Sequence, residues 1–188
     1  MKIFRARSKA QKISNQPIGV LASEFVEYVT SMPNWGEVAK LREEIRKNPV
    51  DDGRYPPPWN YWKYLDPERW AKMTVSVGKS LNLRDGQLGH HLDLGSGAGY
   101  LLAYSQMRGH QSVGVDLGHP LFALITDALG VSSVEHKISP WEPIPLEVEQ
   151  KFDYISAVSI EFDQISLGPG NGSRWWTTTR SSLRTSSS

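Results

Sequence analysis

Several features that would indicate particular classes of protein are missing from this chain. It contains no cysteine, which excludes disulfide bridges and thiolate metal sites. Its 21 basic residues nearly balance its 20 acidic residues, so no overall charge favours a nucleic acid or a membrane surface as partner. No apolar run approaches the roughly 20 residues that a membrane-spanning helix needs. We therefore expect a globular protein of the cytoplasm with no membrane partner.

The five histidines do not form a metal-binding pattern. His90 and His91 are adjacent on an expected strand, so their side chains point to opposite faces. The others, His110, His119 and His136, are scattered along the chain. The sequence therefore predicts no metal site. It is compatible with a structural role for His90 or His91 in the core.

Residues 1–16 form a basic segment without an acid. The segment lacks the apolar centre of a secretory signal. A solvated basic tail is the favoured interpretation, and an organelle transit peptide is the alternative.

Residues 17–83 predict a helical region with a dense aromatic segment. Ser23 is expected to cap a first short helix, Asn34 a second, and Asp66 followed by Pro67 a third. The buried stripe of the third helix is expected to consist of Trp70, Met73, Val77 and Leu81.

The aromatic residues of segment 55–70 allow two interpretations. Packing of the N-terminal helices onto a sheet is the favoured one. The alternative is a cap over an active site, with Tyr61, Trp62 or Tyr64 lining a pocket for a substrate.

Residues 84–163 change to an alternation of strands and helices. This alternation predicts an α/β fold, a Rossmann-like doubly wound and mostly parallel sheet with helices on both faces. The expected strands are 88–94, 112–115, 134–138 and 152–158. The expected helices are 100–108 and 121–129, which are expected to end at Gly109 and Gly130.

Three glycines follow the first of these strands at every second position. They are Gly95, Gly97 and Gly99, preceded by Asp93. Glycine is needed where the backbone leaves a strand sharply and lies against a ligand. The dinucleotide-binding pattern would place a third small residue at position 100, where this chain has Tyr100. A nicotinamide dehydrogenase is therefore disfavoured, and a phosphate-binding loop fails because no Gly-Lys-Ser/Thr follows.

Two acids suggest which ligand the glycines serve. Asp93 would repel a pyrophosphate but suits a cationic amino group, and S-adenosylmethionine has such a group and no phosphate. Asp116 ends the second strand about 20 residues further on, where an acid can accept both ribose hydroxyls. The alternative is that both acids are ordinary polar residues at strand ends.

The stretches LDLGSGAGYLLA, GVD and KFDYISAVS resemble motifs of class I S-adenosylmethionine-dependent methyltransferases, over roughly residues 60–163. The chain is similar to a bacterial subgroup. The resemblance implies strand order 3-2-1-4-5-7-6, with the cofactor above strands 1, 2 and 4. It implies that Asp116 binds the ribose, that Leu117 packs on the adenine, and that the stretch beginning at Ile138 closes the adenine pocket. The residues implied to hold the methionyl part are Asp93, Gly95, Ser96, Gly97, Ala98 and Gly99.

The catalytic residues are not evident from the sequence. Methyl transfer depends mainly on holding the acceptor in line with the methyl group, and a base is needed only if the acceptor must lose a proton. Glu161 follows the fourth strand and is a weak candidate base, with an exposed structural glutamate as the favoured alternative. The amino-group methylation motif of nucleic-acid enzymes is absent, so a small-molecule acceptor is favoured. The sequence does not indicate an oligomeric state.

Residues 164–188 are dominated by Ser, Thr, Gly and Arg without helical or strand periodicity. The remaining strands of the resembled fold have no counterpart here, so we expect a sheet that lacks its last strands. A truncated or frameshifted C-terminus with impaired activity is one hypothesis for this composition. A non-catalytic S-adenosylmethionine-binding or interaction module is the alternative function.

Overall fold

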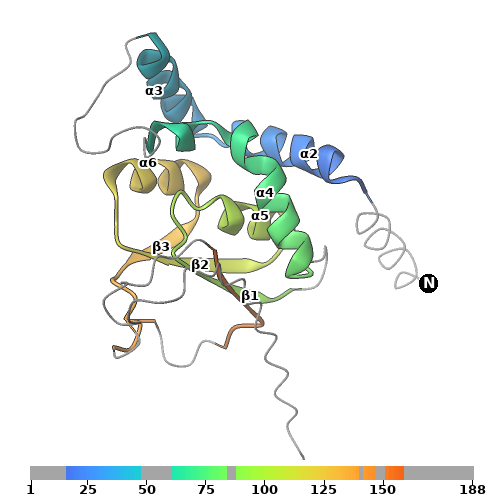
Figure 1. Ribbon diagram of the computed structural model, residues 1–188, viewed down its shortest axis with the longest axis vertical. Helices are drawn as coiled ribbons and strands as arrows, with labels where there is room; N and C mark the ends of the chain where they lie inside the picture. The colour runs from blue at the N-terminus through green and yellow to red at the C-terminus, as the bar shows by residue number, and fades with distance from the viewer. Residues whose placement is uncertain (1–15, 48–60, 84–87, 140–141, 147–150, 159–188) are drawn as a thin grey trace, which may run out of the picture.

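The computed structural model describes residues 16–47, 61–83, 88–139, 142–146 and 151–158 (Figure 1). The predicted candidate base Glu161 and the segments 1–15 and 164–188 lie outside these residues. In chain order the elements are α2 (Ile18–Thr30), α3 (Trp35–Lys47), the 3-10 helix η1 (Tyr61–Leu65), α4 (Pro67–Ser80), β1 (His90–Leu94), α5 (Tyr100–Met107), β2 (Gln111–Asp116), α6 (Pro120–Leu129), β3 (Ser132–Glu135) and β4 (Tyr154–Ala157).

The four strands form one parallel sheet in the order β3-β2-β1-β4. β1 lies at the centre, where Asp93 pairs with Gly114 of β2 and with Ser156 of β4. The predicted α/β class, the parallel pairing and the order of these four strands are confirmed. Parallel neighbouring strands need a crossover connection, which is usually a helix, and this is why the alternation of elements was informative.

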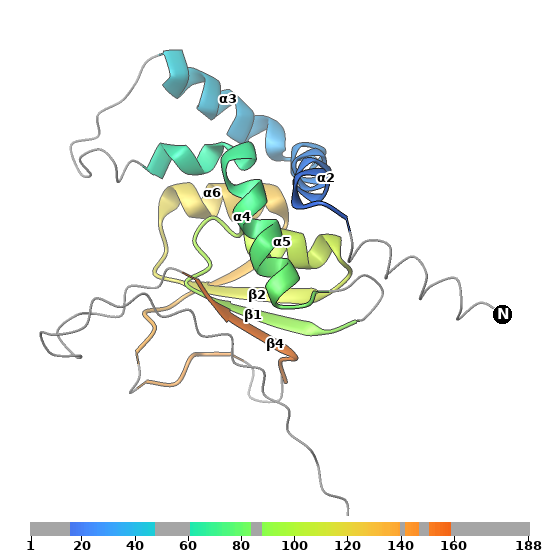
Figure 2. The same ribbon diagram turned by 45° about the vertical axis from the view of Figure 1, so that its right-hand side comes forward.

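All helices in the described part of the chain lie on the same side of the sheet (Figures 1 and 2). The prediction of helices on both faces is therefore wrong for these residues. The connections from β1 to β2 and from β2 to β3 move in one direction across the sheet. Right-handed crossovers in one direction place α5 and α6 on the same face. The return from β3 to β4 passes to the other side of β1, and its described residues, 136–139, 142–146 and 151–153, form no helix.

The two faces of the sheet differ in polarity. A Cβ at Gly114 would meet the side chain of Leu102 on α5, so this residue faces the helices. Residues paired in register share a face, and so the helix-covered face carries His91, Asp93, Ser112, Gly114, Tyr154 and Ser156. The opposite face carries the polar pair His90 and Gln111 at one end and is otherwise apolar, with Leu92, Leu94, Val113, Val115, Ile155 and Ala157.

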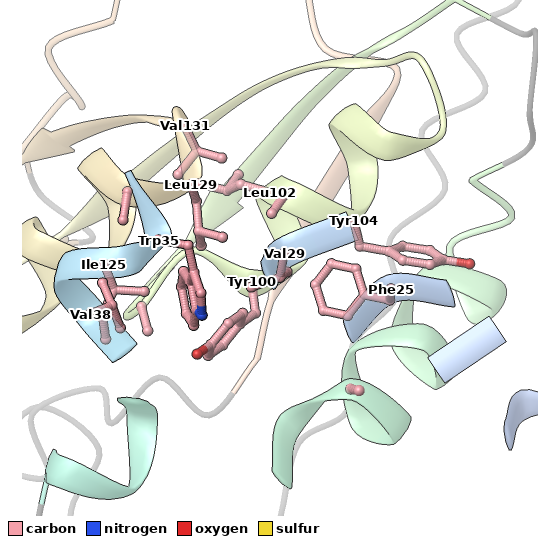
Figure 3. Packing of buried hydrophobic residues seen from close by; sticks show 14 of the residues in the cluster. Phe25, Val29, Trp35, Val38, Tyr100, Leu102, Tyr104, Ile125, Leu129 and Val131 are labelled. Atoms are coloured by element: carbon pink, nitrogen blue, oxygen red, sulfur yellow. The ribbon is translucent and has the colours of Figure 1, made fainter. Parts of the chain in front are cut away.

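The N-terminal helices and the α/β part share one hydrophobic core, which includes residues from both the predicted 17–83 and 84–163 regions (Figure 3). Tyr100, at the start of α5, contacts Phe25 and Trp35 with ring centroids 6.3 and 6.5 Å apart. Its hydroxyl donates a 2.7 Å hydrogen bond to the carbonyl of Tyr64 in η1. Tyr100 thus connects α2, α3 and η1 to the first helix of the α/β part.

Helix starts were predicted with mixed success. Asp66 caps α4 by accepting from the amide of Glu68, with Pro67 in the first turn, as predicted. The second helix begins directly after Asn34, also as predicted. The predicted cap at Ser23 is wrong, because α2 begins at Ile18 and the Ser23 hydroxyl donates back to the carbonyl of Gly19. The buried residues Leu21 and Ala22 extend the apolar face of α2 one turn earlier.

The predicted buried stripe of α4 is wrong in part. Met73 is 42% exposed, whereas Trp70 and Leu81 are half-buried and pack against the core. The helix buries its smaller residues instead, and these are Pro67, Ala71, Thr74, Val75 and Gly78. Small side chains let α4 approach α2 and α5 closely, which the size of the apolar residues alone does not reveal.

The strand boundaries differ from the predicted ones by a few residues. β1 begins at His90, and Leu88, which was expected in the strand, is 85% exposed. β3 spans Ser132–Glu135 and ends before Ile138. Its register against β2, with Val113 opposite Ser132, sets these limits. The predicted glycine ends of α5 and α6 are confirmed, since Gly109 and Gly130 have positive φ.

Candidate functional site

The glycine loop leaves β1 at its carboxyl end and enters α5. All three glycines have positive φ: +70° at Gly95, +52° at Gly97 and +75° at Gly99. The amides of Gly95 and Ser96 both donate to the carbonyl of Val115 on β2, at 2.7 and 3.2 Å. These bonds hold the loop across the ends of two adjacent strands, where open parallel sheets bind ligands.

Gly99 is constrained in two ways. Its φ of +75° lies in the left-handed region, and a Cβ there would come within 2.9 Å of Thr126 on α6 and of Val131. Glycine therefore permits both the turn and the close approach of α5 to α6.

Asp116 is the last residue of β2, and its side chain turns toward the loop. The amide of Gly97 donates a 2.9 Å hydrogen bond to Asp116 Oδ2. The structure thus brings together two of the predicted site residues that are 19 positions apart in the chain. The carboxylate is half-buried and lies beside a backbone turn that has no side chain at Gly97.

Asp93 is 4% exposed and belongs to the helix-covered face. Its Oδ1 accepts a 2.5 Å hydrogen bond from the hydroxyl of Ser156 on β4. Burial raises the pKa of Asp93 to about 7, the Ser156 hydrogen bond opposes this rise, and the negative charge of Asp116 adds to it. The carboxyl of Asp93 is therefore near its titration midpoint at neutral pH.

A cavity of about 190 Å³ opens beside Asp116, between α6 and β3. Asp93 is not among the residues that line this cavity. The volume is below the roughly 300–1,000 Å³ of typical small-molecule sites and suits part of a ligand. Its lining residues are Gly97, Asp116, Gly118, His119, Phe122, Ala123, Thr126, Asp127, Val131, Ser133 and Glu135.

The other predicted cofactor residues have different environments. Ala98 is in the core, and the Ser96 hydroxyl is buried without a hydrogen-bond partner in the described part of the structure. Leu117 is 66% exposed, and Ile138 is half-buried beyond the end of β3. Neither Leu117 nor Ile138 lines the cavity.

Sequence reasoning did not identify His119 and Phe122 as lining residues. His119 caps α6 by accepting from the amide of Leu121, and its ring lies 5.3 Å from that of Phe122. The usable signal was His119 followed by Pro120, which is typical of a helix start directly after the loop that carries Asp116.

The described aromatics of segment 55–70 pack, as the favoured interpretation predicted. Tyr64 stacks on Trp70 with centroids 4.4 Å apart, and its ring edge contacts Phe122 on α6 at 4.9 Å. Burial raises the pKa of Tyr64, and the negative charge of Asp116 raises it further. The cluster therefore packs η1 onto α6 close to the cavity.

These features define an α/β protein with a four-stranded parallel sheet and a helical N-terminal layer. Comparisons with known proteins add no family, since no family model matches the chain and no curated protein matches it. Within the described ranges no group of three or more His, Asp or Glu side chains could hold a metal ion. Among the described helices, none is long and apolar enough to cross a membrane.

Proposed function

We propose that this protein binds S-adenosylmethionine at the carboxyl end of its sheet and transfers the methyl group to a small-molecule acceptor. The observation that carries the proposal is the 2.9 Å contact between the Gly97 amide and the Asp116 carboxylate. It places an acid from β2 beside a loop of three glycines that follows β1. This arrangement suits a ligand whose ribose hydroxyls donate to the carboxylate. Because the glycines have no side chains, other atoms of the ligand can lie close to the loop backbone.

The residues present fit the cofactor chemically. An ionised carboxylate offers about four acceptor positions on two oxygens. Gly97 uses one position on Oδ2 of Asp116, which leaves capacity for two ribose hydroxyls. Leu117 is exposed next to this carboxylate and provides an apolar surface for an adenine ring.

The charge around the site favours a cation over a pyrophosphate. Among the described residues that line the cavity are the carboxylates of Asp116, Asp127 and Glu135, and none of these described residues is a lysine or arginine. A ligand with two negative phosphates would be repelled there, whereas a sulfonium and an amino group would be attracted. Tyr100, which fills the core between Phe25 and Trp35, also argues against the close helix–strand packing of dinucleotide-binding loops.

The bound cofactor would supply an electrophilic methyl group, and the protein's own contribution would be positioning. The loop anchored on Val115 and the carboxylate of Asp116 would fix the ligand relative to the sheet. Holding a nucleophile close and in line is worth up to roughly 7–11 kcal/mol, so little further catalysis is required for an acceptor that is already nucleophilic. Glu161 stays the candidate base for an acceptor that must lose a proton.

Calorimetric titration of the full chain tests the proposal. We expect S-adenosylmethionine and its demethylated product to bind and NAD not to bind. Binding of NAD alone, or of none of the three, would overturn the proposal. A screen with a radiolabelled methyl group against small molecules, proteins and RNA then separates a methyltransferase from a non-catalytic binding module, because only the enzyme transfers label.

A further inference from the structure

A buried chain of three polar side chains joins β1 to β4 on the helix-covered face. His91 Nε2 lies 2.7 Å from the hydroxyl oxygen of Ser156, and that hydroxyl donates to Asp93 Oδ1 at 2.5 Å. His91 is 0% exposed, and Asp93 and Ser156 are each 4% exposed. The three groups are shielded from water, so each depends on the others for hydrogen bonding.

The number of protons available determines which of the three side chains donates each hydrogen bond. A serine hydroxyl has one proton, and an ionised carboxylate only accepts. When Asp93 is ionised, Ser156 must donate to it, and His91 must then donate from Nε2 to Ser156. This tautomer leaves Nδ1 without a proton, and Nδ1 of His91 is buried with no hydrogen-bond partner in the described residues.

Burial is the main reason that His91 is neutral. Burial lowers the pKa of His91 to about 4, and the nearby His110, which precedes β2, lowers it further. The pKa of Asp93 is lowered by the hydrogen bond from Ser156 and raised by the negative charge of Asp116. A neutral His91 with its proton on Nε2 is therefore compatible with the charges that shift the pKa values of His91 and Asp93.

We propose that Ser156 is a positioning residue that holds the Asp93 carboxyl at the base of the glycine loop, and that His91 fixes the direction in which Ser156 donates. This inference rests on the proposed function, in which Asp93 and the loop hold the methionyl part of the cofactor. Ser156 is the donor that reaches Asp93 from the neighbouring strand. Without it the carboxylate would be buried beside the like charge of Asp116, so it would either reorient or take up a proton.

The test compares Ser156→Ala with Ser156→Thr, which keeps a hydroxyl, in the full chain. We expect Ser156→Ala to bind S-adenosylmethionine about tenfold more weakly by calorimetry, the loss expected for one hydrogen bond to a charged group. In ligand-free protein, ¹³C NMR should show a higher titration midpoint for Asp93, because the Ser156 hydrogen bond lowers its pKa. Ser156→Thr should restore both values. The ¹⁵N shifts of His91 in the wild-type protein should show the proton on Nε2 above pH 7.

A folded Ser156→Ala variant with an unchanged Asp93 midpoint and unchanged affinity would overturn the inference, as would a proton on Nδ1 of His91. If Ser156→Ala does not fold, His91→Leu and His91→Gln decide the question. The leucine variant should alter the Asp93 titration, and the glutamine variant, which can still donate, should preserve it. A wild-type protein that binds no S-adenosylmethionine would refute the proposed function, while the Asp93 titration in ligand-free protein would still decide the positioning role.

Discussion

The ring of Tyr104 on α5 lies directly against the backbone of Gly78 on α4. A Cβ at Gly78 would overlap Cδ1 and Cε1 of that ring. Tyr104 is 2% exposed, and its ring also meets Phe25 on α2 edge-on at 5.7 Å. The contact therefore joins the N-terminal helical layer to the α/β part, and its close approach depends on glycine.

Gly78→Ala is expected to destabilise the protein by about 1–3 kcal/mol despite the better helix propensity of alanine, because the added methyl group overpacks the core. Urea denaturation measures the free energy of unfolding. Gly36→Ala is the matched control, since Gly36 lies in α3 with open space at its Cβ position. The control should gain about 0.5–1 kcal/mol. Equal effects in the two variants would contradict the close packing at Gly78.

Gly99→Ala should be more damaging than Gly109→Ala. Both glycines have positive φ, which costs an alanine about 1–2 kcal/mol. At Gly99 the methyl group would also press on Thr126 and Val131, adding about 1–3 kcal/mol, whereas the space at Gly109 is open. Thermal denaturation of both variants checks the order, and a Gly109→Ala variant that is the less stable of the two would contradict it.

Asp93 and His91 should make opposite contributions to the pH dependence of stability. The folded-state pKa of Asp93 is raised from 3.8 to about 7, so its contribution is present below pH 4 and is lost as the pH rises toward 7. The folded-state pKa of His91 is lowered from 6.5 to about 4, so its contribution is present above pH 6.5 and is lost as the pH falls toward 4. Between pH 4 and 6.5 the contribution of Asp93 to the free energy of unfolding falls with pH while that of His91 rises, so the two changes largely cancel.

Single substitutions should reveal how each group changes the free energy of unfolding with pH. In Asp93→Asn the free energy of unfolding should rise with pH between 4 and 6.5, by up to about 1.4 kcal/mol per pH unit. In His91→Gln it should fall with pH between 4 and 7. Urea denaturation of the wild type and both variants across this range measures the slopes. Parallel profiles for all three proteins would show that the two groups do not titrate as described.

Asp116→Ala should weaken S-adenosylmethionine binding by about 1–3 kcal/mol, the cost of leaving hydrogen-bonding groups without their acceptor. Asp116→Asn retains an oxygen that can accept from the Gly97 amide, so it should lose less. Calorimetry on both variants measures the two affinities. Unchanged affinity in Asp116→Ala would refute the assignment of this carboxylate to the ribose.

Local sequence patterns predicted much of the fold. Gly109 and Gly130 end their helices because the left-handed conformation costs glycine little, and Asp66 caps α4 because its short side chain reaches a free amide. These outcomes depend on a few neighbouring residues. The glycine spacing and Asp116 likewise indicated where β1 and β2 end and which side chains could meet there.

Other features could not be read locally. Met73 was wrongly expected to be buried in α4, and the burial of Gly78 was not anticipated. A helix buries the residues that its neighbours have room for, and those neighbours come from distant segments. The limits of β3 follow from its register against β2. The lining residues His119 and Phe122 became evident only when α6 was placed against the sheet.

The sequence by itself determined the alternation of strands and helices, the parallel sheet, and the loop of glycines flanked by two acids, because these depend on backbone conformation and chain order. The tertiary structure alone decided what the acids contact: Asp116 accepts from Gly97, whereas Asp93 is buried against Ser156 from a strand 63 residues away. Contacts between distant segments depend on how the strands pack side by side, and no local pattern encodes that packing.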